Sequence, residues 1–446
     1  MMKCGTRVLT GILLTVISGL AFAAPMTLRQ CVELALTNNP EMAASQARIA
    51  QAESAQAQVA AAALPRVTLS MAATRTDDPL AAFGLKLGQR SVDPVTDFTA
   101  SNLNHPDAVN NLNTRFEISL PVYTGGQLAA QTEQARALAR AARAGDVAAR
   151  QLLIRQVAEA YQGIHSARAY IKVTGQSVKA AEETVRVVEN LLKQGVAVKS
   201  DLLTARVHLE EARLRVDEAT RREAGAMDRL NMLLGRSLGE LLEIAEPPAT
   251  TLLTDSDSAL AAQARAEHPG LRALQAQVDA ARTQVEAARA GRKPQVSVMA
   301  RQDWNDERIG LAASSYTVAG QLSWQAFDGG ASRAGIARAQ AGLAEAEARL
   351  GQAEAGVLLE VREARRLALE ADARLVARES AVADAQEALR LTEIRYKNGV
   401  TTLLDVLAAQ ARLDKVLADQ VAARHEREIS RVELKRSAGV LSVETL

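Results

Sequence analysis

Apolar side chains recur with a period of 3.6 residues over two very long stretches of the chain, residues 126–194 and 330–397. That period indicates an amphipathic α-helix, and neither stretch contains a proline that would break one. Each predicted helix is about 100 Å long at about 1.5 Å per residue. Because isolated helices are marginal in water, helices of this length need packing partners along most of their surface.

Six shorter stretches with the helical period supply these partners. They cover residues 26–38, 41–63, 201–234, 258–267, 271–291 and 403–437. Two of the longer ones laid end to end approach the length of one long helix. The sequence therefore predicts a rod of paired helices.

Four stretches of about ten residues alternate between apolar and polar side chains, which is the period of a β-strand. They cover residues 67–77, 112–122, 295–304 and 316–326. One apolar and one polar face per strand is typical of a transmembrane barrel strand, with lipid on one side and water on the other. A soluble sheet with one wet face would give the same alternation.

Aromatic residues make up only 3% of the chain, yet several fall at the ends of the predicted strands. They are Tyr123, Trp304, Tyr316, Trp324 and Phe327. Two groups of aromatic side chains, one at each end of the strands, are typical of the two interfaces of a membrane. We therefore expect these residues to be membrane-interface aromatics.

The chain is internally duplicated. Two helix-stopping prolines, Pro40 and Pro269, lie 269 − 40 = 229 residues apart, and Gly195 and Gly399 lie 399 − 195 = 204 residues apart. The difference between the two offsets matches a longer loop in the first copy, residues 78–111. The predicted organisation is a first repeat at residues 24–235, a connecting segment at 236–257 and a second repeat at 258–446.

Each long helix ends at a short break before the next helix. Gly195 and Gly399 suit the left-handed conformation that commonly ends a helix. Asp201 and Asp405 follow six residues later, in the first turns of the next helix, where a carboxylate complements the helix dipole. We predict two helix–turn–helix tips, with helix capping as the simplest role of the two aspartates.

Charge and chemistry narrow the function. Lys and Arg total 53 and Asp and Glu total 52, so the chain lacks the basic surplus of a nucleic-acid-binding protein. The histidines are scattered without the spacing of metal ligands, and the sequence has no phosphate-binding Gly-x-x-x-x-Gly-Lys motif. We therefore expect no enzyme activity, no catalytic residues, no cofactor and no metal site.

Residues 1–23 are predicted to be a signal peptide. Lys3 and Arg7 supply positive charge before an apolar run, and the small residues Ala21 and Ala23 occupy the positions that cleavage requires. The protein is thus expected to be exported. No later stretch reaches the roughly 18 apolar residues of a membrane-spanning helix, so crossing a membrane would require a β-barrel.

Four strands are too few to enclose a usable lumen, and open sheet edges are not tolerated in lipid. If the strands cross a membrane, several copies of the chain must join edge to edge. The number of copies does not follow from the strand pattern.

Three motifs resemble those of the TolC-like outer membrane channels, also called outer membrane factors. They are Leu34–Pro40 (LALTNNP), Pro121–Gly126 (PVYTGG) and Tyr396–Gln410 (YKNGVTTLLDVLAAQ). The resemblance extends over the whole chain after the signal peptide, including the duplication and the two long helices. It implies a mixed α and β membrane protein: a long α-helical coiled-coil barrel, and a transmembrane β-barrel to which each protomer of a homotrimer gives four strands.

The resemblance also implies a function. Such a channel is the passive exit duct of a tripartite efflux pump or a type I secretion system, gated at its periplasmic tip. It lies in the outer membrane of a Gram-negative bacterium and extends into the periplasm. Its partners would be outer membrane lipid, a periplasmic adaptor protein and an inner membrane transporter of the RND, ABC or MFS type. The cargo stays open, since drugs, metal ions and secreted proteins all pass through members of the family.

Roles for the tip residues follow from the same resemblance. A bond between Tyr396 and Asp201 would help to hold the gate closed. Asp405, repeated around a threefold axis, would form a ring of like charges that raises carboxylate pKa values and favours cations. Thr401 and Ala408 stand where the family pattern has a basic and a second acidic group, so we expect a weaker closure. The adaptor would dock on Lys193, Gly195, Val196, Lys397, Gly399 and Val400.

Two alternatives are a periplasmic adaptor, also called a membrane fusion protein, and a soluble periplasmic coiled-coil scaffold. An adaptor would carry one helical hairpin within β-rich domains. A scaffold would lack the strand pairs and their aromatic ends. The two duplicated units with four alternating strands favour the channel.

Overall fold

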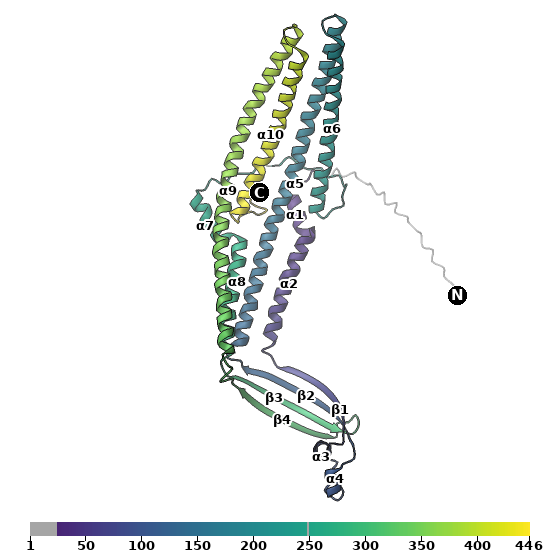
Figure 1. The fold of residues 1–446 in the computed structure, drawn as a ribbon, viewed down its shortest axis with the longest axis vertical. Coiled ribbons are helices and arrows are strands. Elements are labelled where there is room, and N and C mark those ends of the chain that lie inside the picture. The colour runs from purple at the N-terminus through teal and green to yellow at the C-terminus, as the bar shows by residue number, and fades with distance from the viewer. Residues whose placement is uncertain (1–24, 248) are drawn as a thin grey trace, which may run out of the picture.

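The computed structural model describes residues 25–247 and 249–446, and the signal peptide expected at residues 1–23 lies outside them. The molecule is a long rod (Figure 1). Helices occupy most of its length, a four-stranded sheet lies toward one end, and two helical hairpins form the opposite end (Figure 1).

Helices and strands follow one another in two similar series. In the first half they are α1 (Leu28–Asn38), α2 (Pro40–Ala61), β1 (Arg66–Thr76), α3 (Pro79–Gly88), α4 (Ala100–Asn104), β2 (Val109–Tyr123), α5 (Gln127–Lys193) and α6 (Lys199–Leu233). In the second half they are α7 (Asp257–Glu267), α8 (Pro269–Ala290), β3 (Gln295–Asp306), β4 (Ala313–Ser323), α9 (Ala331–Lys397) and α10 (Leu403–Ser437).

The two long helices, α5 and α9, have 67 residues each and are accompanied by shorter helices. α5 packs against α2 and α8 in the half near the sheet and against α6 in the other half, while α9 packs against α8 and then α10 (Figure 1). Many buried positions on the long helices are alanines, such as Ala181 and Ala368. Small side chains at the contact allow the helix axes to lie close together.

The largest buried side chains gather where the short helices meet end to end. Tyr161, Ile164 and Leu230 are fully buried there, and burial of each stabilises the fold by roughly 1.5–3 kcal/mol. The Tyr161 hydroxyl lies 2.9 Å from the carbonyl oxygen of Met26 and 2.5 Å from that of Ala245. It thereby ties the start of the described chain and the connecting segment to α5. We call this region the equatorial core.

The sheet is antiparallel, and its strand order β1–β2–β3–β4 follows the chain. The register places apolar residues opposite one another on one face, for example Val67 opposite Ile118 and Ala300 opposite Val318. This apolar face is open to solvent in the single chain, with Val67 and Val318 exposed by 59% and 74%. Within the described residues, the outer edges of β1 and β4 have no partner strand.

Two strands, β2 and β4, differ from the expected ranges by three residues. β2 begins at Val109 and β4 at Ala313, each three residues before the predicted start, and β4 ends at Ser323 rather than at residue 326. The added residues pair through their backbones. Polar side chains such as Asn110 interrupt the apolar alternation but do not end the strand, because neighbouring strands pair through hydrogen bonds between backbone groups.

Three helix starts also differ by two residues, among them that of α8, which begins at Pro269 rather than at residue 271. α1 begins at Leu28 rather than at residue 26, because Thr27 and Gln30 form a capping box and Met26 pairs with Ile244 in an isolated bridge. α6 begins at Lys199, two residues before the expected start.

Residues 78–111, expected as a loop, contain the helices α3 and α4. The side chain of Asp78 caps α3, Pro79 occupies its first turn, and Thr99 caps α4. Helices this short carry little periodic signal, and Asp, Pro and Thr are also the residues that favour turns.

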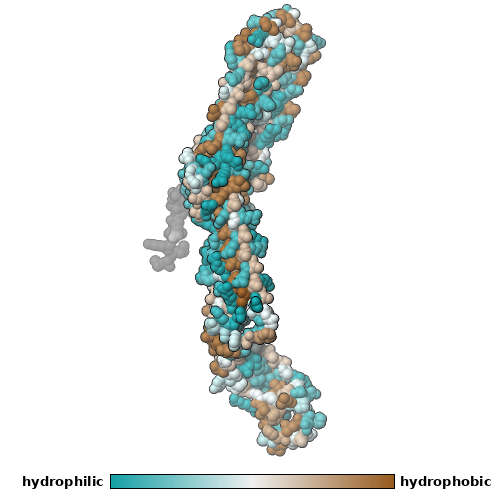
Figure 2. Space-filling model, turned by 60° about the vertical axis from the view of Figure 1, so that its left-hand side comes forward, coloured by the Kyte–Doolittle hydropathy of each residue, from teal (hydrophilic) through white to brown (hydrophobic). Residues whose placement is uncertain are grey.

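Hydropathy is mixed along the helical part. Among the helices of residues 25–247 and 249–446, none combines the length and the apolar composition needed to cross a membrane. Figure 2 shows hydrophilic and hydrophobic side chains interspersed along the rod, and a hydrophobic cluster where the helices meet the sheet.

Gly125 and Gly329 occupy equivalent turns before the long helices, with φ of +67° and +63°. A β-carbon at Gly125 would lie 2.6 Å from the carbonyl oxygen of Ala290, whereas nothing lies within 4 Å of one at Gly329. Both Ala substitutions carry the left-handed penalty of about 1–2 kcal/mol, and only Gly125→Ala adds a clash. We expect Gly125→Ala to lower the midpoint of thermal unfolding further than Gly329→Ala, measured by circular dichroism. Equal midpoints would contradict this expectation.

Candidate functional site

The tips of the α5–α6 and α9–α10 hairpins are built in the same way. At the end of α5 the amides of Gly195 and Val196 donate to carbonyl oxygens of the last turn, at 3.0 and 2.9 Å. At the end of α9 the amides of Gly399 and Val400 do the same, both at 2.9 Å. This Schellman arrangement needs a left-handed residue, which the φ of +76° at Gly195 and +70° at Gly399 provide.

The surface of both tips is open. No atom lies within 4 Å of the point where a β-carbon would stand on Gly195 or Gly399. Val196 and Val400 beside them are largely exposed. The residues predicted to dock an adaptor lie at these two tips: Lys193, Gly195, Val196, Lys397, Gly399 and Val400.

Asp405 caps the start of α10. Its Oδ2 accepts hydrogen bonds from the hydroxyl groups of Thr401 (2.5 Å) and Thr402 (2.7 Å) and from the Thr402 amide (3.0 Å). The amide of Asp405 donates in return to the Thr402 hydroxyl oxygen at 3.3 Å, which completes a capping box. The capping role expected from the sequence is therefore confirmed for Asp405.

Within one chain, the surroundings of Asp405 favour its ionised form. The Thr401 hydroxyl, followed by the Thr402 hydroxyl and amide, lowers the pKa of Asp405 from 3.8 to about 2. The ring of like charges expected around a threefold axis stays a prediction. A carboxylate whose pKa is lower in the folded than in the unfolded chain stabilises the folded state at pH values above its ordinary pKa of 3.8. That stabilisation is lost as the pH falls through about 2. The cap of α10 is thus intact throughout the physiological range.

The start of α6 lacks such a cap. Its N-cap residue is Val198, which makes no side-chain hydrogen bond there. Asp201 lies in the first turn, where its charge complements the helix dipole. The two tips therefore share a backbone but differ in side-chain chemistry.

Tyr396 does not form the hydrogen bond to Asp201 that the sequence analysis expected. Within the described part of the chain its buried hydroxyl has no hydrogen-bond partner. Burial, and secondly the negative charge of Asp201, raise the pKa of Tyr396. Proximity of the two residues is thus correct, but the bond is not made, and a role of the pair in gating stays a prediction.

The ring of Tyr396 packs instead against an apolar cluster that joins all the helices of the two hairpins. Val188 of α5, Ala205 of α6, and Leu403 and Leu407 of α10 are buried in it. We call this group the tip cluster. It holds the two hairpins together just behind the turns.

A polar contact that the sequence analysis missed lies further from the tips. Asp414 of α10 accepts hydrogen bonds from the Ser177 hydroxyl of α5 (2.6 Å) and from the Gln410 side-chain amide (2.8 Å). Arg215 of α6 lies 3.9 Å from its other oxygen. A single aspartate in a charged helix is usually a solvated residue, so nothing in the sequence marks Asp414.

Other polar contacts near the tips stay within one hairpin. Arg206 pairs with Glu189 between α6 and α5, and Arg378 pairs with Asp419 between α9 and α10. In residues 25–247 and 249–446, the polar contacts that join the two hairpins between the equatorial core and the tips are those of Asp414.

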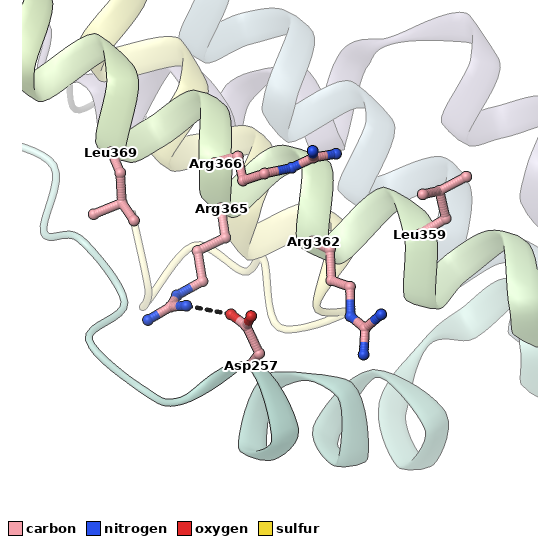
Figure 3. Close-up of a pocket in the computed structure, with 6 residues that line it drawn as sticks. All are labelled: Asp257, Leu359, Arg362, Arg365, Arg366 and Leu369. Atoms are coloured by element: carbon pink, nitrogen blue, oxygen red, sulfur yellow. Dashed lines mark hydrogen bonds and ion pairs between the residues drawn. The ribbon is translucent and has the colours of Figure 1, made fainter.

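A pocket of about 390 Å³ lies beside the equatorial core, between α7 and α9 (Figure 3). Asp257 at the start of α7 pairs with Arg365 of α9, and Arg362 and Arg366 lie nearby (Figure 3). The pair holds the short helix against the long one. Its lining consists of Asp257, three arginines and two leucines. Across the described residues, His, Cys, Asp and Glu side chains form no group of three or more that could hold a metal ion.

The expected interface aromatics lie toward the two ends of the sheet. Tyr123 and Trp324 are at the helix-proximal end, Phe327 lies just beyond it, and all three are exposed. The Trp324 indole N–H donates to a backbone carbonyl of the turn before β3, at 3.1 Å. Trp304 and the exposed Tyr316 lie toward the other end. Their role at a membrane interface stays a prediction.

Long paired helices that end in two exposed tips, continued by a small sheet with an exposed apolar face, define the class of outer membrane channel-tunnels. The chain belongs to the outer membrane efflux protein family, which it matches over residues 31–236 and 260–440. The resemblance, the outer membrane location and the function as the exit duct of an efflux system are thereby confirmed, and the adaptor alternative is not favoured.

Known relatives cover most of the chain. The pyoverdine export outer membrane protein OpmQ of Pseudomonas aeruginosa is 25% identical over 397 residues, which are 88% of this chain and 80% of that protein. The outer membrane protein OprJ of the same species is 25% identical over 432 residues, or 94% and 85% of the two chains.

Solved structures share the fold. The outer-membrane channel OprN superposes with a TM-score of 0.78 at 25% identity, covering 92% of this chain and 89% of that one. CusC superposes with a TM-score of 0.80 at 18% identity, covering 93% and 92%, and supports the fold alone. The expected fold class, long paired helices with a small β-domain, is confirmed.

Thr401→Val should raise the pKa of Asp405, because it removes the hydroxyl donor that lowers this pKa most. The shift should be incomplete, since both Thr402 donors remain. A ¹³C NMR titration of aspartate-labelled protein would measure it, with Asp405→Asn identifying the resonance. Thr401→Ser keeps the donor and serves as the control. The same pKa in Thr401→Val and the parent protein would show that this hydrogen bond does not form in solution.

Proposed function

We propose that three copies of the chain join edge to edge into one duct, with a twelve-stranded β-barrel in the outer membrane and a helical tunnel across the periplasm. The observation that carries this proposal is the sheet, which has an exposed apolar face, a polar face and two unpaired edges within the described residues. Pairing β4 of one copy with β1 of the next removes the open edges. It also places the apolar face, with its aromatic ends, toward lipid and the polar face toward water.

The proposed cargo is small organic molecules. Relatives whose names state a cargo include a pyoverdine export protein, a solvent efflux protein and an antibiotic efflux protein. These names favour small-molecule efflux over protein secretion. An adaptor would dock on the exposed tip residues. An inner membrane transporter would supply the energy, since this sequence has no nucleotide-binding motif.

The tips are, in this proposal, the gate of the duct. Two layers of contact hold the hairpins together: the tip cluster around Tyr396, and the polar contacts of Asp414. Opening would move α9–α10 away from α5–α6 and break both. Asp201 would act on Tyr396 through its charge, and Asp405, ionised at neutral pH, would add a negative ring at the entrance.

The purified protein in planar lipid bilayers tests the function. Discrete channel openings from a trimeric particle support the duct. Recovery in the soluble periplasmic fraction, without detergent and without conductance, would refute it.

Asp414→Ala should raise single-channel conductance. A hydrogen bond to a charged group contributes at least about 1.5 kcal/mol, so its loss would shift the ratio of open to closed tips roughly tenfold. Asp419→Ala is the matched control, because it removes an aspartate of the same helix that pairs with Arg378 inside one hairpin. Equal conductance of the two variants would remove Asp414 from the gate.

Gly399→Trp should abolish efflux in cells while leaving the trimer assembled. The position is exposed and has room for a side chain within the chain, but a bulky indole would cover the surface offered to the adaptor. Gly239→Trp is the control: φ is +78° there, nothing lies within 4 Å, and the site is in the connecting segment far from the tips. Efflux should survive in the control. Normal efflux through Gly399→Trp would argue against docking at this turn.

A further inference from the structure

The stretch between β1 and β2 is a folded unit rather than an open loop. The Lys86 ammonium group lies 2.7 Å from a carboxylate oxygen of Asp97, and Asp97 is only 6% exposed. The other Asp97 oxygen accepts the amide of Asp93 at 2.9 Å. The rings of Phe83 and Phe98 meet edge to face at 5.6 Å. An ion pair and an aromatic contact thus fix α3 against the segment that follows it. We call residues 78–108 the β1–β2 cap.

The β1–β2 cap crosses the end of the sheet that is remote from the long helices (Figure 1). The Gln89 side chain donates to the carbonyl oxygen of Asn110 (2.7 Å) and to the side chain of Asn111 (2.9 Å), both in β2. Gly88 packs against Asn305 of β3, whose amide nitrogen would lie 3.7 Å from a β-carbon at residue 88. One more residue along, the guanidinium group of Arg90 donates to the carbonyl oxygen of Ser314 in β4, at 2.7 Å. Residues 88–90 therefore span β2, β3 and β4.

The crossing lies on the polar face of the sheet. Asn111, Asn113 and Asn305 alternate with the apolar residues and share one network, in which the Asn305 side-chain oxygen accepts from both other asparagines at 3.1 Å. Asp303 extends the network by accepting from Asn113 and from Arg115. Asn111 and Asp303 are buried. Gln89 joins the same network through Asn111.

Arg90 has an unusual backbone. Its φ is +57°, and within the described residues no other residue except glycine has a positive φ. Arg90 follows α3 in the position that Gly195 and Gly399 occupy at the ends of α5 and α9. All three helix ends have the same pair of backbone hydrogen bonds. A β-carbon is disfavoured in this conformation. Strained residues persist where surrounding contacts hold them, and here the contact is the Arg90 side chain on β4.

We infer that the β1–β2 cap is a lid that narrows the outer mouth of the duct, and that Arg90 is its latch. This inference rests on the proposed trimer, which turns the polar face toward the lumen. Three lids, each fixed across three strands of its own protomer, would then lie over the outer opening. They would exclude large solutes that arrive from outside, while the water-filled path remains open to small ones.

Access of reagents to a thiol in the lumen tests the lid without interference from the tip. The substitution Ser119→Cys lies on the polar face of β2, deeper than the lid. Intact cells producing the full chain are treated with a small membrane-impermeant methanethiosulfonate, or with a maleimide that carries a long polyethylene glycol chain. The chain without Ser119→Cys corrects for Cys31, which is fully buried.

Arg90→Gly is the decisive variant, because it removes the latch and relieves the backbone strain, so the fold should persist. Arg75→Ala is the matched control: Arg75 donates to Asn110 at 3.4 Å, but by alternation it lies on the apolar face. We expect the polyethylene glycol reagent to label the introduced thiol faster in Arg90→Gly than in the parent, on the order of tenfold for the loss of one charged hydrogen bond. In Arg75→Ala the rate should be unchanged.

The small reagent separates the two proposals. It should label the introduced thiol in every variant at a similar rate, because the duct is water-filled. Equal labelling by the large reagent in Arg90→Gly and the parent overturns the lid and leaves the duct standing. Failure of the small reagent in all variants overturns the duct, and the lid with it.

Discussion

Close packing of small side chains along α5 and α9 is the constraint on which the rest of the structure depends. Ala158 and Ala181 on α5, and Ala364 and Ala368 on α9, are buried against the shorter helices. Side chains of this size keep helix axes close, so partners can run alongside a 67-residue helix without diverging. Larger residues such as Tyr161 are concentrated where short helices meet end to end and leave space between their ends. An interior packed in this way offers little room for rearrangement.

Much of the architecture could be predicted because it depends on the residue pattern within each helix, strand or turn. The 3.6-residue period, the absence of proline and the paired glycines determine the long helices and their turns, and the two-residue period determines the strands. Contacts between distant elements were harder. The Tyr396–Asp201 bond is expected from the resemblance, but in the structure the Tyr396 ring packs against the tip cluster and its hydroxyl has no hydrogen-bond partner among the described residues. The contact made by Asp414 could not be predicted, because its hydrogen-bond donor, Ser177, is far away in sequence. The helices α3 and α4 were missed because caps and turns use the same residues.

The duct would be controlled at both ends by different chemistry. At the tips, an apolar cluster and one aspartate join the two hairpins, which in the proposed gate would separate for passage. At the sheet, asparagines, Asp303 and Arg115 form an extended polar network under the β1–β2 cap, which Arg90 also bonds to β4. The first arrangement has few polar bonds and can open repeatedly. The second has many, and such networks are rigid when every member is satisfied.

The duplication produced two hairpins with the same backbone but unequal helix starts. Thr402 and Asp405 seal the first turn of α10, whereas the first turn of α6 has only a dipole contact from Asp201. If a force pulled on the tips, the first turn of α6 would therefore unwind before the first turn of α10. In a ring of three chains, weakly and strongly capped helix starts would alternate around the end of the tunnel. The resistance of that end to deformation would then have threefold symmetry, although the backbone pattern repeats six times.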